Sequence, residues 1–291
     1  MVLTTILIAG VPEHFNLPWQ LGLERRAFIR AGVDLKWRTV PEGTGAMCDL
    51  LRKGEIDLAV LVTEGAVRDI LNGNPSRIVS NYVDSPLTWG VYVGSKTAIQ
   101  KPEDLKGVPF AISRFNSGGH LMAMSYAKSQ GWALTEKDFV VVNNLKGALE
   151  RMAGSETLAF LWEKATTSPW VDNGSLRCVD EYRSTWPCFM LVARNEVLEA
   201  QGDSVRRVVK VVQDQARGLM EKKSAPDMVA QRYGMSVVAA KDWCGSVRWN
   251  TTGNVDVKAL QEVSRTLHAL GLVDRDHSEE ELKTVADAAF R

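Results

Sequence analysis

The first 63 residues alternate apolar runs of strand length with segments whose apolar side chains recur at helical spacing. Residues 3–9 and 33–40 have the length and composition of strands, and the segment 54–63 is a turn followed by a buried strand. A helix is predicted in each interval, over residues 19–30 and 46–53. Strand–helix–strand units of this size pair their strands in parallel and cross over right-handed. The sequence therefore predicts an α/β fold whose ligands bind beyond the carboxyl ends of the strands.

The same alternation restarts after residue 102, and an extended segment stands on each side of this second α/β region. Residues 89–94 lead out of the first region, and residues 187–194 lead back to it. We therefore expect two lobes and a central cleft lined by strand-end loops. Lobe I would comprise residues 1–88 and 193–291, with the C-terminal helices, and lobe II residues 89–192.

The composition excludes several classes of partner. The chain has 291 residues, 45% of them hydrophobic, and its formal net charge is zero. Nucleic acids and membrane surfaces select a basic excess, so neither is expected as a partner. No run approaches the ~18 apolar residues of a membrane span, so no membrane insertion is expected. The N-terminal run lacks a basic region, which favours a cytoplasmic protein, whereas removal of a leader would make the protein periplasmic.

Catalytic and metal-binding signatures are absent from the sequence. The four cysteines stand apart, at positions 48, 178, 188 and 244, which predicts free thiols rather than a zinc site. No hydrolase, phosphate-loop or dinucleotide motif occurs, so we assign no catalytic residue, metal or cofactor. Ser117 and His120 lie in one helical segment, where the imidazole would point along the helix. His120 is therefore expected on the helix surface.

The stretch from residue 108 to 126 contains the main candidate for ligand binding. A β-rich run gives way there to a glycine-rich helix start, and the loop supplies Ser113, Arg114, Phe115, Asn116, Ser117 and Gly118. Unpaired N–H groups at a helix start carry partial positive charge and suit a carboxylate, sulfonate or phosphate. Arg114 adds a full charge in a fork that fits two oxygens. An ordinary helix cap is the alternative, because Ser, Asn and Gly are also usual capping residues.

Ten further positions at strand ends or crossings are candidate ligand contacts: Asn16, Trp19, Thr44, Gly45, Thr63, Glu64, Trp89, Asn144, Glu163 and Trp186. The tryptophans would enclose a flat or apolar body, since aromatic rings commonly line pockets. Glu163 follows a buried strand directly and would face a cation or hydroxyl of the ligand. The alternatives are core packing for the tryptophans and helix capping for the polar residues.

Short segments resemble the type II periplasmic-binding-protein-like family, in the group that binds nitrate, taurine, sulfonates and thiamine-pyrimidine precursors. Residues 55–59 read EIDLA, like the G-E-I-D strand of that fold. Residues 102–110 read PEDLKGVPF, like the segment that begins its second domain. Trp249 and the helical pattern over residues 255–270 resemble its C-terminal end. The resemblance implies a two-lobed α/β fold with two mixed sheets flanked by helices around a central cleft.

A closer resemblance is to a leaderless branch of this family that is also found in fungi. It is carried by residues 10–15 (GVPEHF), 160–164 (FLWEK) and 185–188 (TWPC). The resemblance implies a small-molecule binding protein that closes by hinge motion on an anionic or heterocyclic metabolite. A membrane permease would be a partner only of an exported form. The alternative is an enzyme of thiamine-pyrimidine or related heterocycle metabolism, although the chain lacks the cysteine cluster expected of the fungal pyrimidine synthase.

Overall fold

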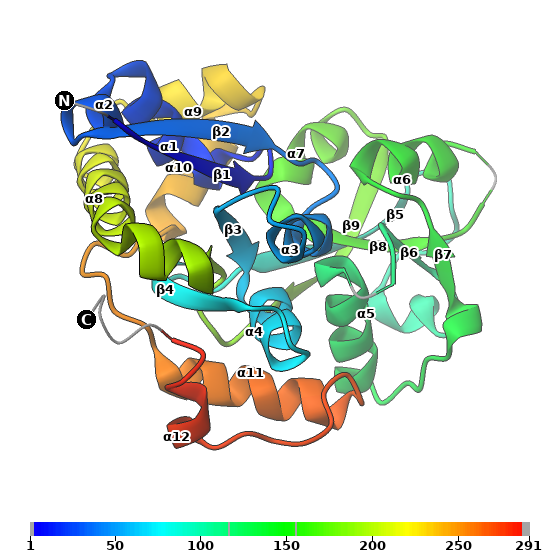
Figure 1. The fold of residues 1–291 in the computed structure, drawn as a ribbon. Helices are drawn as coiled ribbons and strands as arrows, with labels where there is room; N and C mark the ends of the chain where they lie inside the picture. The colour runs from blue at the N-terminus through cyan, green and yellow to red at the C-terminus, as the bar shows by residue number, and fades with distance from the viewer. Residues whose placement is uncertain (1–2, 116, 155, 287–291) are drawn as a thin grey trace. The chain divides into compact units, whose positions relative to one another are not determined.

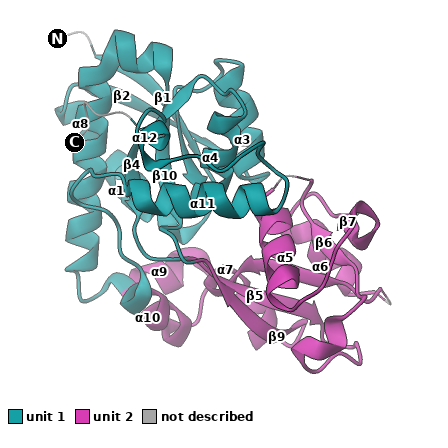
Figure 2. Ribbon diagram, turned by 90° about the horizontal axis from the view of Figure 1, so that it is seen from below, with its two compact units in different colours: residues 1–86, 185–225, 244–291 teal, residues 87–184, 226–243 magenta. Residues whose placement is uncertain are grey.

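The computed structural model describes residues 3–115, 117–154 and 156–286. The chain forms two compact units and passes between them more than once (Figure 2). Unit 1 comprises Met1–Pro86, Thr185–Ala225 and Cys244–Arg291, and unit 2 comprises Leu87–Ser184 and Pro226–Trp243.

The sheet of unit 1 has the strand order β2-β1-β3-β10-β4. Figure 1 labels its strands β1, β2, β3 and β4. Its strands are β1 (Thr4–Gly10), β2 (Val33–Thr39), β3 (Leu58–Val62), β4 (Ser76–Val83) and β10 (Phe189–Arg194). Strand β1 pairs in parallel with β2 and β3, whereas β10 is antiparallel to both β3 and β4. The carboxyl ends of β1 to β4 therefore lie at one edge of this sheet.

Helices cover both faces of this sheet. They are the short helix η1 (His14–Asn16), α1 (Leu17–Glu24), α2 (Ala27–Arg30), α3 (Thr44–Arg52), α4 (Thr63–Leu71), α8 (Asn195–Met220), α11 (Val257–Ala269) and α12 (Glu279–Leu282). Helices α1 and α2 contact α8, which packs on β2 and β10, while α3 and α4 contact each other and β3. Right-handed crossovers place these two groups on opposite faces. The buried run Leu58–Val62 lies between them.

The predicted helix over residues 19–30 is two helices in the structure. Arg26 adopts a left-handed conformation, with φ of 54°, and separates α1 from α2. This conformation costs an L-residue roughly 1–2 kcal/mol. It allows Phe28 on α2 to stack against Trp19 on α1, with ring centroids 5.9 Å apart. Packing of the two rings therefore accompanies the break.

The sheet of unit 2 has the order β7-β6-β8-β5-β9. Its strands are β5 (Thr88–Gly94), β6 (Phe110–Ile112), β7 (Phe139–Val141), β8 (Ala159–Glu163) and β9 (Leu176–Arg183). Strand β6 is parallel to β7 and β8, and β5 is antiparallel to β8 and β9. The two sheets therefore have the same topology. In each, the fourth strand in the sheet order is antiparallel to both of its neighbours: β10 in unit 1 and β5 in unit 2.

Unit 2 contains the short helices η2 (Pro102–Leu105) and η3 (Glu136–Asp138), with α5 (Gly118–Ser129), α6 (Leu145–Met152) and α7 (Lys164–Asp172). Helices α9 (Ala225–Tyr233) and α10 (Val237–Ser246) fall mainly in its second segment. Side chains of α6 and α7 pack on a core cluster that includes Tyr92, Phe160 and Leu176. Helix α5 contacts β6 and β8. Because β6–α5–β7 and β7–α6–β8 cross in opposite directions, α5 covers the other face.

Helix α7 forms where the sequence shows no helical periodicity. Its centre reads Thr166-Thr167-Ser168-Pro169, and proline inside a helix removes one backbone donor. The Ser168 hydroxyl donates to the carbonyl of Ala165 at 2.9 Å, the acceptor that the missing N–H would have used. A local side-chain bond therefore compensates for a sequence that is unfavourable for helix.

The unit boundaries follow from the position of β10. This strand pairs with β3 and β4, so the chain has returned to unit 1 by Thr185 rather than at residue 193. The segment Pro226–Trp243, expected in the first lobe, groups with unit 2. None of the helices in the described ranges has the length and apolar character needed to span a membrane.

We expect Gly147→Ala to destabilise the protein. A Cβ at this position would meet the carbonyl oxygen of Val142, and the Gly147 N–H donates to Asn144 Oδ1 at 3.0 Å. Urea denaturation should show the free energy of unfolding lowered by about 1–3 kcal/mol, the usual cost of overpacking.

Gly218→Ala is the matched control. This glycine lies in α8. Apart from its chain neighbours and the backbone of α8, no atom of the described residues comes within 4 Å of the position that an alanine methyl would take, so alanine should stabilise the helix by about 0.5–1 kcal/mol. Equal effects of the two substitutions would contradict the close approach at Gly147.

Candidate ligand-binding site

In unit 1, the predicted residues of the second and third loops meet where α3 and α4 begin. Thr44 Oγ1 accepts the N–H of Val62 at 3.1 Å, which ties the start of α3 to the end of β3. A Cβ on Gly65 would come within 2.5 Å of Thr44 Cγ2, so the two helix starts are in close contact. Gly45 is partly exposed in the first turn of α3. The structure brings these residues together, and Thr44 already has a structural partner.

Thr63 is bonded to the segment that returns from unit 2. Its N–H donates to the carbonyl of Cys188 at 3.0 Å, and its hydroxyl donates to the carbonyl of Pro187. The side chain is fully buried. Thr63 therefore holds the returning segment against the start of α4, and its hydroxyl is committed to that contact.

Glu64 and Trp186 form a buried polar pair beside Thr63. Trp186 Nε1 donates to Glu64 Oε2 at 3.0 Å, and the two side chains are only 5% and 4% exposed, respectively. Burial raises the pKa of Glu64 to about 7, although the hydrogen bond from Trp186 opposes the shift. The carboxyl group therefore changes charge near neutral pH, at the edge where the strands of unit 1 end.

Asn16 and Trp19 follow β1 but have different surroundings. Asn16 Nδ2 donates to the carbonyl of Val11 at 2.8 Å, while its buried Oδ1 has no partner among the described residues. Trp19 has no exposed surface and packs among Phe28, Trp37 and Tyr82. Asn16 remains a candidate ligand contact. Trp19 packs as a core residue, although its buried Nε1 also has no hydrogen-bond partner among the described residues.

Two residues that the sequence did not assign to the site fix the loop that carries Asn16. Tyr82 Oη and Trp249 Nε1 donate to the carbonyl of Phe15, at 2.6 Å and 2.9 Å. They lie 67 and 234 residues further along the chain. No local pattern could reveal these contacts, because they depend on the tertiary fold.

In unit 2, the predicted loop connects β6 to α5 as expected. Ser117 is the N-cap of α5, and its Oγ accepts the N–H of His120 at 3.2 Å. The Ser117 N–H donates to the carbonyl of Arg114 at 3.2 Å, which closes the loop into a turn. Ser113 is buried, Arg114 and Gly118 are partly exposed, and Asn116 lies outside the described residues. The loop thus combines a guanidinium with the glycine-rich start of a helix.

Aromatic packing fixes one side of this loop. Phe115 is 40% exposed and meets the rings of His120 and Phe139 edge-on, at centroid distances of 5.3 Å and 6.1 Å. His120 also meets Phe139 edge-on at 4.6 Å and is buried. The expectation of a helix-surface histidine is therefore wrong, because the two phenylalanines cover the imidazole.

Glu163 and Asn144 cap helices. The Glu163 carboxylate accepts the N–H groups of Ala165 and Thr166 at 3.0 Å and 2.6 Å, and Thr166 Oγ1 donates to it at 2.7 Å. Burial raises the pKa of Glu163, against the effect of these hydrogen bonds. Asn144 Oδ1 accepts the N–H of Gly147. The cleft role preferred for Glu163 gives way to capping, because α7 starts directly after β8.

Trp89 lies on β5 opposite Glu163 of β8 and Tyr182 of β9. It is buried, and its Nε1 has no hydrogen-bond partner within the described ranges. An indole N–H normally finds a partner when buried. Trp89 therefore remains a candidate ligand contact within unit 2.

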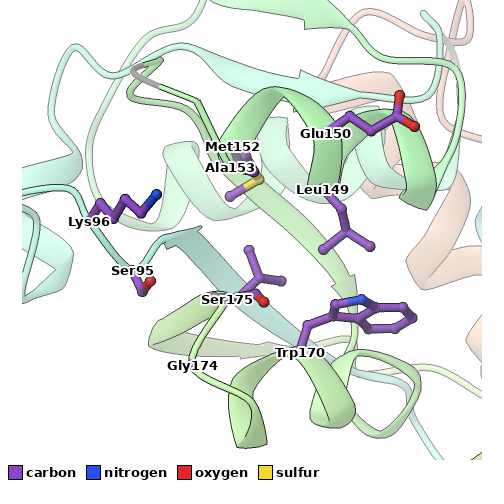
Figure 3. Close-up of a pocket in the computed structure, with 10 residues that line it drawn as sticks. Ser95, Lys96, Leu149, Glu150, Met152, Ala153, Trp170, Gly174 and Ser175 are labelled. Atoms are coloured by element: carbon purple, nitrogen blue, oxygen red, sulfur yellow. The ribbon is translucent and has the colours of Figure 1, made fainter.

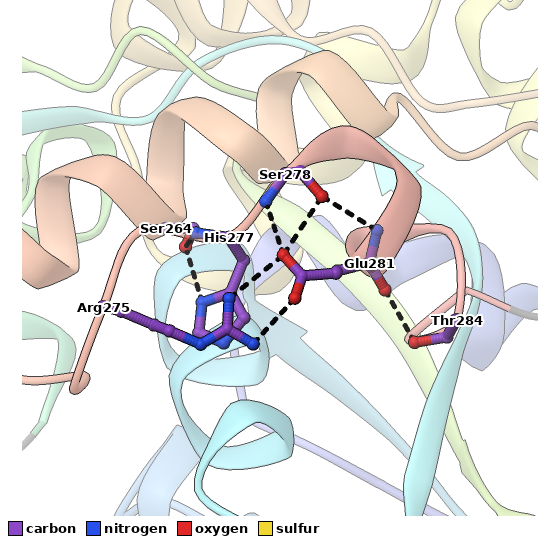
Figure 4. Close-up of polar contacts among 6 residues, drawn as sticks. All are labelled: Ser264, Arg275, His277, Ser278, Glu281 and Thr284. Atoms are coloured by element: carbon purple, nitrogen blue, oxygen red, sulfur yellow. Dashed lines mark hydrogen bonds and ion pairs between the residues drawn. The ribbon is translucent and has the colours of Figure 1, made fainter.

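A serine–histidine pair outside the predicted loops is structural. Ser264 Oγ lies 3.2 Å from the ring atom His277 Nδ1, and it accepts the backbone N–H of His277 at 3.1 Å (Figure 4). Ser264 has no exposed surface. Beside it, Arg275 pairs with Glu281, whose carboxylate also accepts the N–H of Ser278 at the start of α12. The pair joins α11 to α12 and offers no accessible nucleophile.

In the described ranges, no three His, Cys, Asp or Glu side chains gather into a possible metal site. All four cysteines are free thiols.

Comparison with known proteins places these features in a binding-protein fold. A family model described as "Ca3427-like PBP" matches residues 89–182, within unit 2. The two mixed sheets flanked by helices are those of the type II periplasmic binding protein fold, which confirms the fold inferred from sequence. No curated protein matches the chain.

Solved structures show the same fold at low sequence identity. The CA3427 gene product of Candida albicans, described as defining a family with the generic periplasmic binding protein fold, is 24% identical, with a TM-score of 0.88 over 97% of this chain and 94% of that one. The alkanesulfonate-binding protein SsuA of Xanthomonas axonopodis pv. citri, bound to MOPS, is 17% identical, with a TM-score of 0.79 over 99% of each chain. PhnD1 of Prochlorococcus marinus, in complex with methylphosphonate, is 12% identical, with a TM-score of 0.65 over 93% and 99%.

Glu64→Gln should change how stability depends on pH. The pKa of Glu64 is about 7 in the folded protein, against 4.5 for the ordinary group. The folded state therefore holds the proton more tightly, so the stability from this group is complete below pH 4.5 and is lost as pH rises through 7. The loss amounts to roughly 3 kcal/mol at 1.36 kcal/mol for each pKa unit.

Glutamine stays neutral and can still accept the Trp186 N–H, so the variant should keep its stability from about pH 5 to about pH 8. Urea denaturation at several pH values measures the difference from wild type. Glu55→Gln is the control, because that carboxylate is exposed. Parallel pH profiles for wild type and Glu64→Gln would show that the Glu64 carboxyl is not perturbed.

Proposed function

We propose that this chain is a solute-binding protein whose ligand is a small organic molecule with a sulfonate, phosphonate or carboxylate group. The observation that carries the proposal is the β6–α5 loop, where Arg114 stands next to the start of a 12-residue helix. The partial positive charge of a helix start and a guanidinium both attract an oxyanion. The same loop holds the buried hydroxyls of Ser113 and Ser117, which can donate hydrogen bonds.

A comparison of the helix starts that follow β6, β7 and β8 supports this choice of loop. Helix α7 begins with the Glu163 carboxylate on its N–H groups, so a negative charge already occupies that end. Helix α6 begins with the amide oxygen of Asn144. Helix α5 begins with a neutral hydroxyl and two glycines, and the absence of side chains on Gly118 and Gly119 lets a ligand approach the backbone. An external anion is therefore best accommodated at α5.

The structural relatives support the same ligand class. SsuA is an alkanesulfonate-binding protein and was bound to MOPS, and PhnD1 was in complex with methylphosphonate. Both share the fold of this chain at low identity. We extend their ligand chemistry, a small acid group on a short organic body, to this protein as part of the proposal. The proposal also includes a cytoplasmic location, with a membrane permease as partner only of an exported form.

Native mass spectrometry and calorimetry test the proposed function. Mass spectra of freshly purified protein should show a bound small molecule that denaturation releases. Calorimetric titration with 1-butanesulfonate, butylphosphonate and valerate should detect binding of at least one, while 1-butanol, which lacks the acid group, should not bind. A protein without a co-purified ligand that fails to bind all three acids would overturn the proposal.

Arg114→Ala should weaken binding of the acid without loss of fold. Loss of a charge-assisted hydrogen bond costs about 1.5–3 kcal/mol, or roughly ten- to a hundred-fold in affinity. Arg114→Lys should recover only part, because an ammonium cannot make the two-pronged contact. Calorimetry measures the affinities and a thermal melt checks the fold.

Arg151→Ala is the matched control in the same unit. Arg151 is a surface residue that pairs with Glu156 at 2.6 Å, so its removal should leave affinity unchanged. Equal affinities of wild type and Arg114→Ala for the acid would show that the β6–α5 loop only caps a helix and does not bind the ligand.

A further inference from the structure

Unit 2 contains a cavity at the sheet edge opposite the β6–α5 loop. Strand β5 runs antiparallel to β8, with Trp89 opposite Glu163 and Tyr92 opposite Phe160. Ser95 and Lys96 follow the end of β5, so they lie near the edge where β8 begins. The start of α5 follows the other end of the parallel strand β6. This cavity is therefore separate from the candidate anion site.

The cavity has a volume of about 460 Å³ and lies between the C-terminal ends of α6 and α7 (Figure 3). Volumes of roughly 300–1,000 Å³ are typical of small-molecule pockets. Leu149 and Met152 of α6, Trp170 of α7 and Leu176 of β9 provide its apolar lining. Leu149 and Trp170 pack only partly into the core cluster of unit 2 and keep exposed surface. The cavity can therefore hold the apolar body of a ligand, with the Trp170 indole as a flat wall.

Charge at the cavity is supplied chiefly by Lys96. This residue makes no ion pair with any part of the chain that the structure describes, and Figure 3 shows its ammonium directed toward the space beside Met152. Glu150 also lines the cavity, but it is exposed, pairs with Lys146 at 3.7 Å, and turns its carboxylate away in Figure 3. The positive charge of Lys96 is therefore the one that a ligand meets.

Backbone N–H groups occupy several of the carbonyls at the helix ends beside the cavity. In the last turn of α7, the carbonyl of Pro169 accepts the N–H of Asn173 at 3.1 Å. The carbonyl of Trp170 accepts the N–H of Ser175 at 2.9 Å. The carbonyl of Leu149 accepts the N–H of Ala153 at 2.9 Å in α6. Such capping satisfies the groups that carry the partial negative charge of a helix end.

We infer that this cavity is a second small-molecule site, which takes an organic anion with a flat apolar body. The apolar body would lie against Trp170 and Leu149, and its carboxylate would pair with the Lys96 ammonium. The hydroxyls of Ser95 and Ser175 line the same cavity and can donate hydrogen bonds to that carboxylate. The inference does not depend on the function proposed for the β6–α5 loop.

A charge series of indole probes tests the inference on the full chain. Indole-3-acetate, tryptophol and tryptamine share one ring and carry an anionic, a neutral and a cationic group. Ligand-observed NMR titration should give the tightest binding for indole-3-acetate and the weakest for tryptamine. Equal binding of the three probes, tighter binding of tryptamine, or no binding of indole-3-acetate would overturn the inference.

Lys96→Gln locates the charge contact without risk to folding, because Lys96 is exposed. It should weaken indole-3-acetate binding about two- to fivefold, as expected for one solvent-accessible ion pair, and leave tryptophol binding unchanged. The control Lys137→Gln removes an exposed lysine of the same unit that does not line the cavity, and should change neither.

Arg114→Ala separates this site from the proposed function. It should leave indole-3-acetate binding intact even if it abolishes binding of the alkyl acids. Loss of indole-3-acetate binding in Arg114→Ala, or an unchanged affinity in Lys96→Gln, would overturn the second site. Binding of indole-3-acetate with failure of every alkyl acid would overturn the proposed function alone.

Discussion

The site depends on how each helix that starts at a strand end satisfies its first N–H groups. Such helices leave unpaired donors with partial positive charge at the sheet edge where ligands bind. A different group accepts these N–H hydrogen bonds at each helix start: the Glu163 carboxylate at α7, the Asn144 amide oxygen at α6 and the Ser117 hydroxyl at α5. The choice of cap therefore decides where an external anion can bind, and Arg114 reinforces that choice at α5.

The two units repeat one topology with different use of the sheet edge. In unit 1 the antiparallel strand is β10, and the segment before it supplies Trp186 to Glu64 and carbonyls to Thr63. In unit 2 the antiparallel strand is β5, which carries Trp89 next to the capped start of α7. In unit 1, Thr63 and Glu64 at the strand end therefore bind the segment that precedes β10. In unit 2, the β6–α5 loop instead places the Arg114 guanidinium beside the start of α5.

Periodicity predicts most strands and helices of this chain, because each depends on local spacing of apolar residues. Periodicity does not predict helix α7, because Pro169 and the Thr and Ser residues before it disfavour a helix. In the structure the Ser168 hydroxyl donates to the Ala165 carbonyl in place of the N–H that Pro169 lacks. The site is harder to predict. A tryptophan after a strand can line a pocket or fill the core, and Phe28, Trp37 and Tyr82 decide the outcome for Trp19. Glu163 likewise becomes a cap because no loop separates β8 from α7.

The position of β10 has a consequence for synthesis of the chain on the ribosome. This strand pairs with both β3 and β4, yet about a hundred residues of unit 2 are made between β4 and β10. At roughly 5–20 residues per second, about 5–20 s pass between synthesis of β4 and synthesis of β10, the inner strand that pairs with it. Throughout that interval β3 and β4 present unpaired edges, which are templates for wrong pairing. All five strands of the unit 2 sheet are made before β10, so that sheet has the opportunity to form before the sheet of unit 1 is complete.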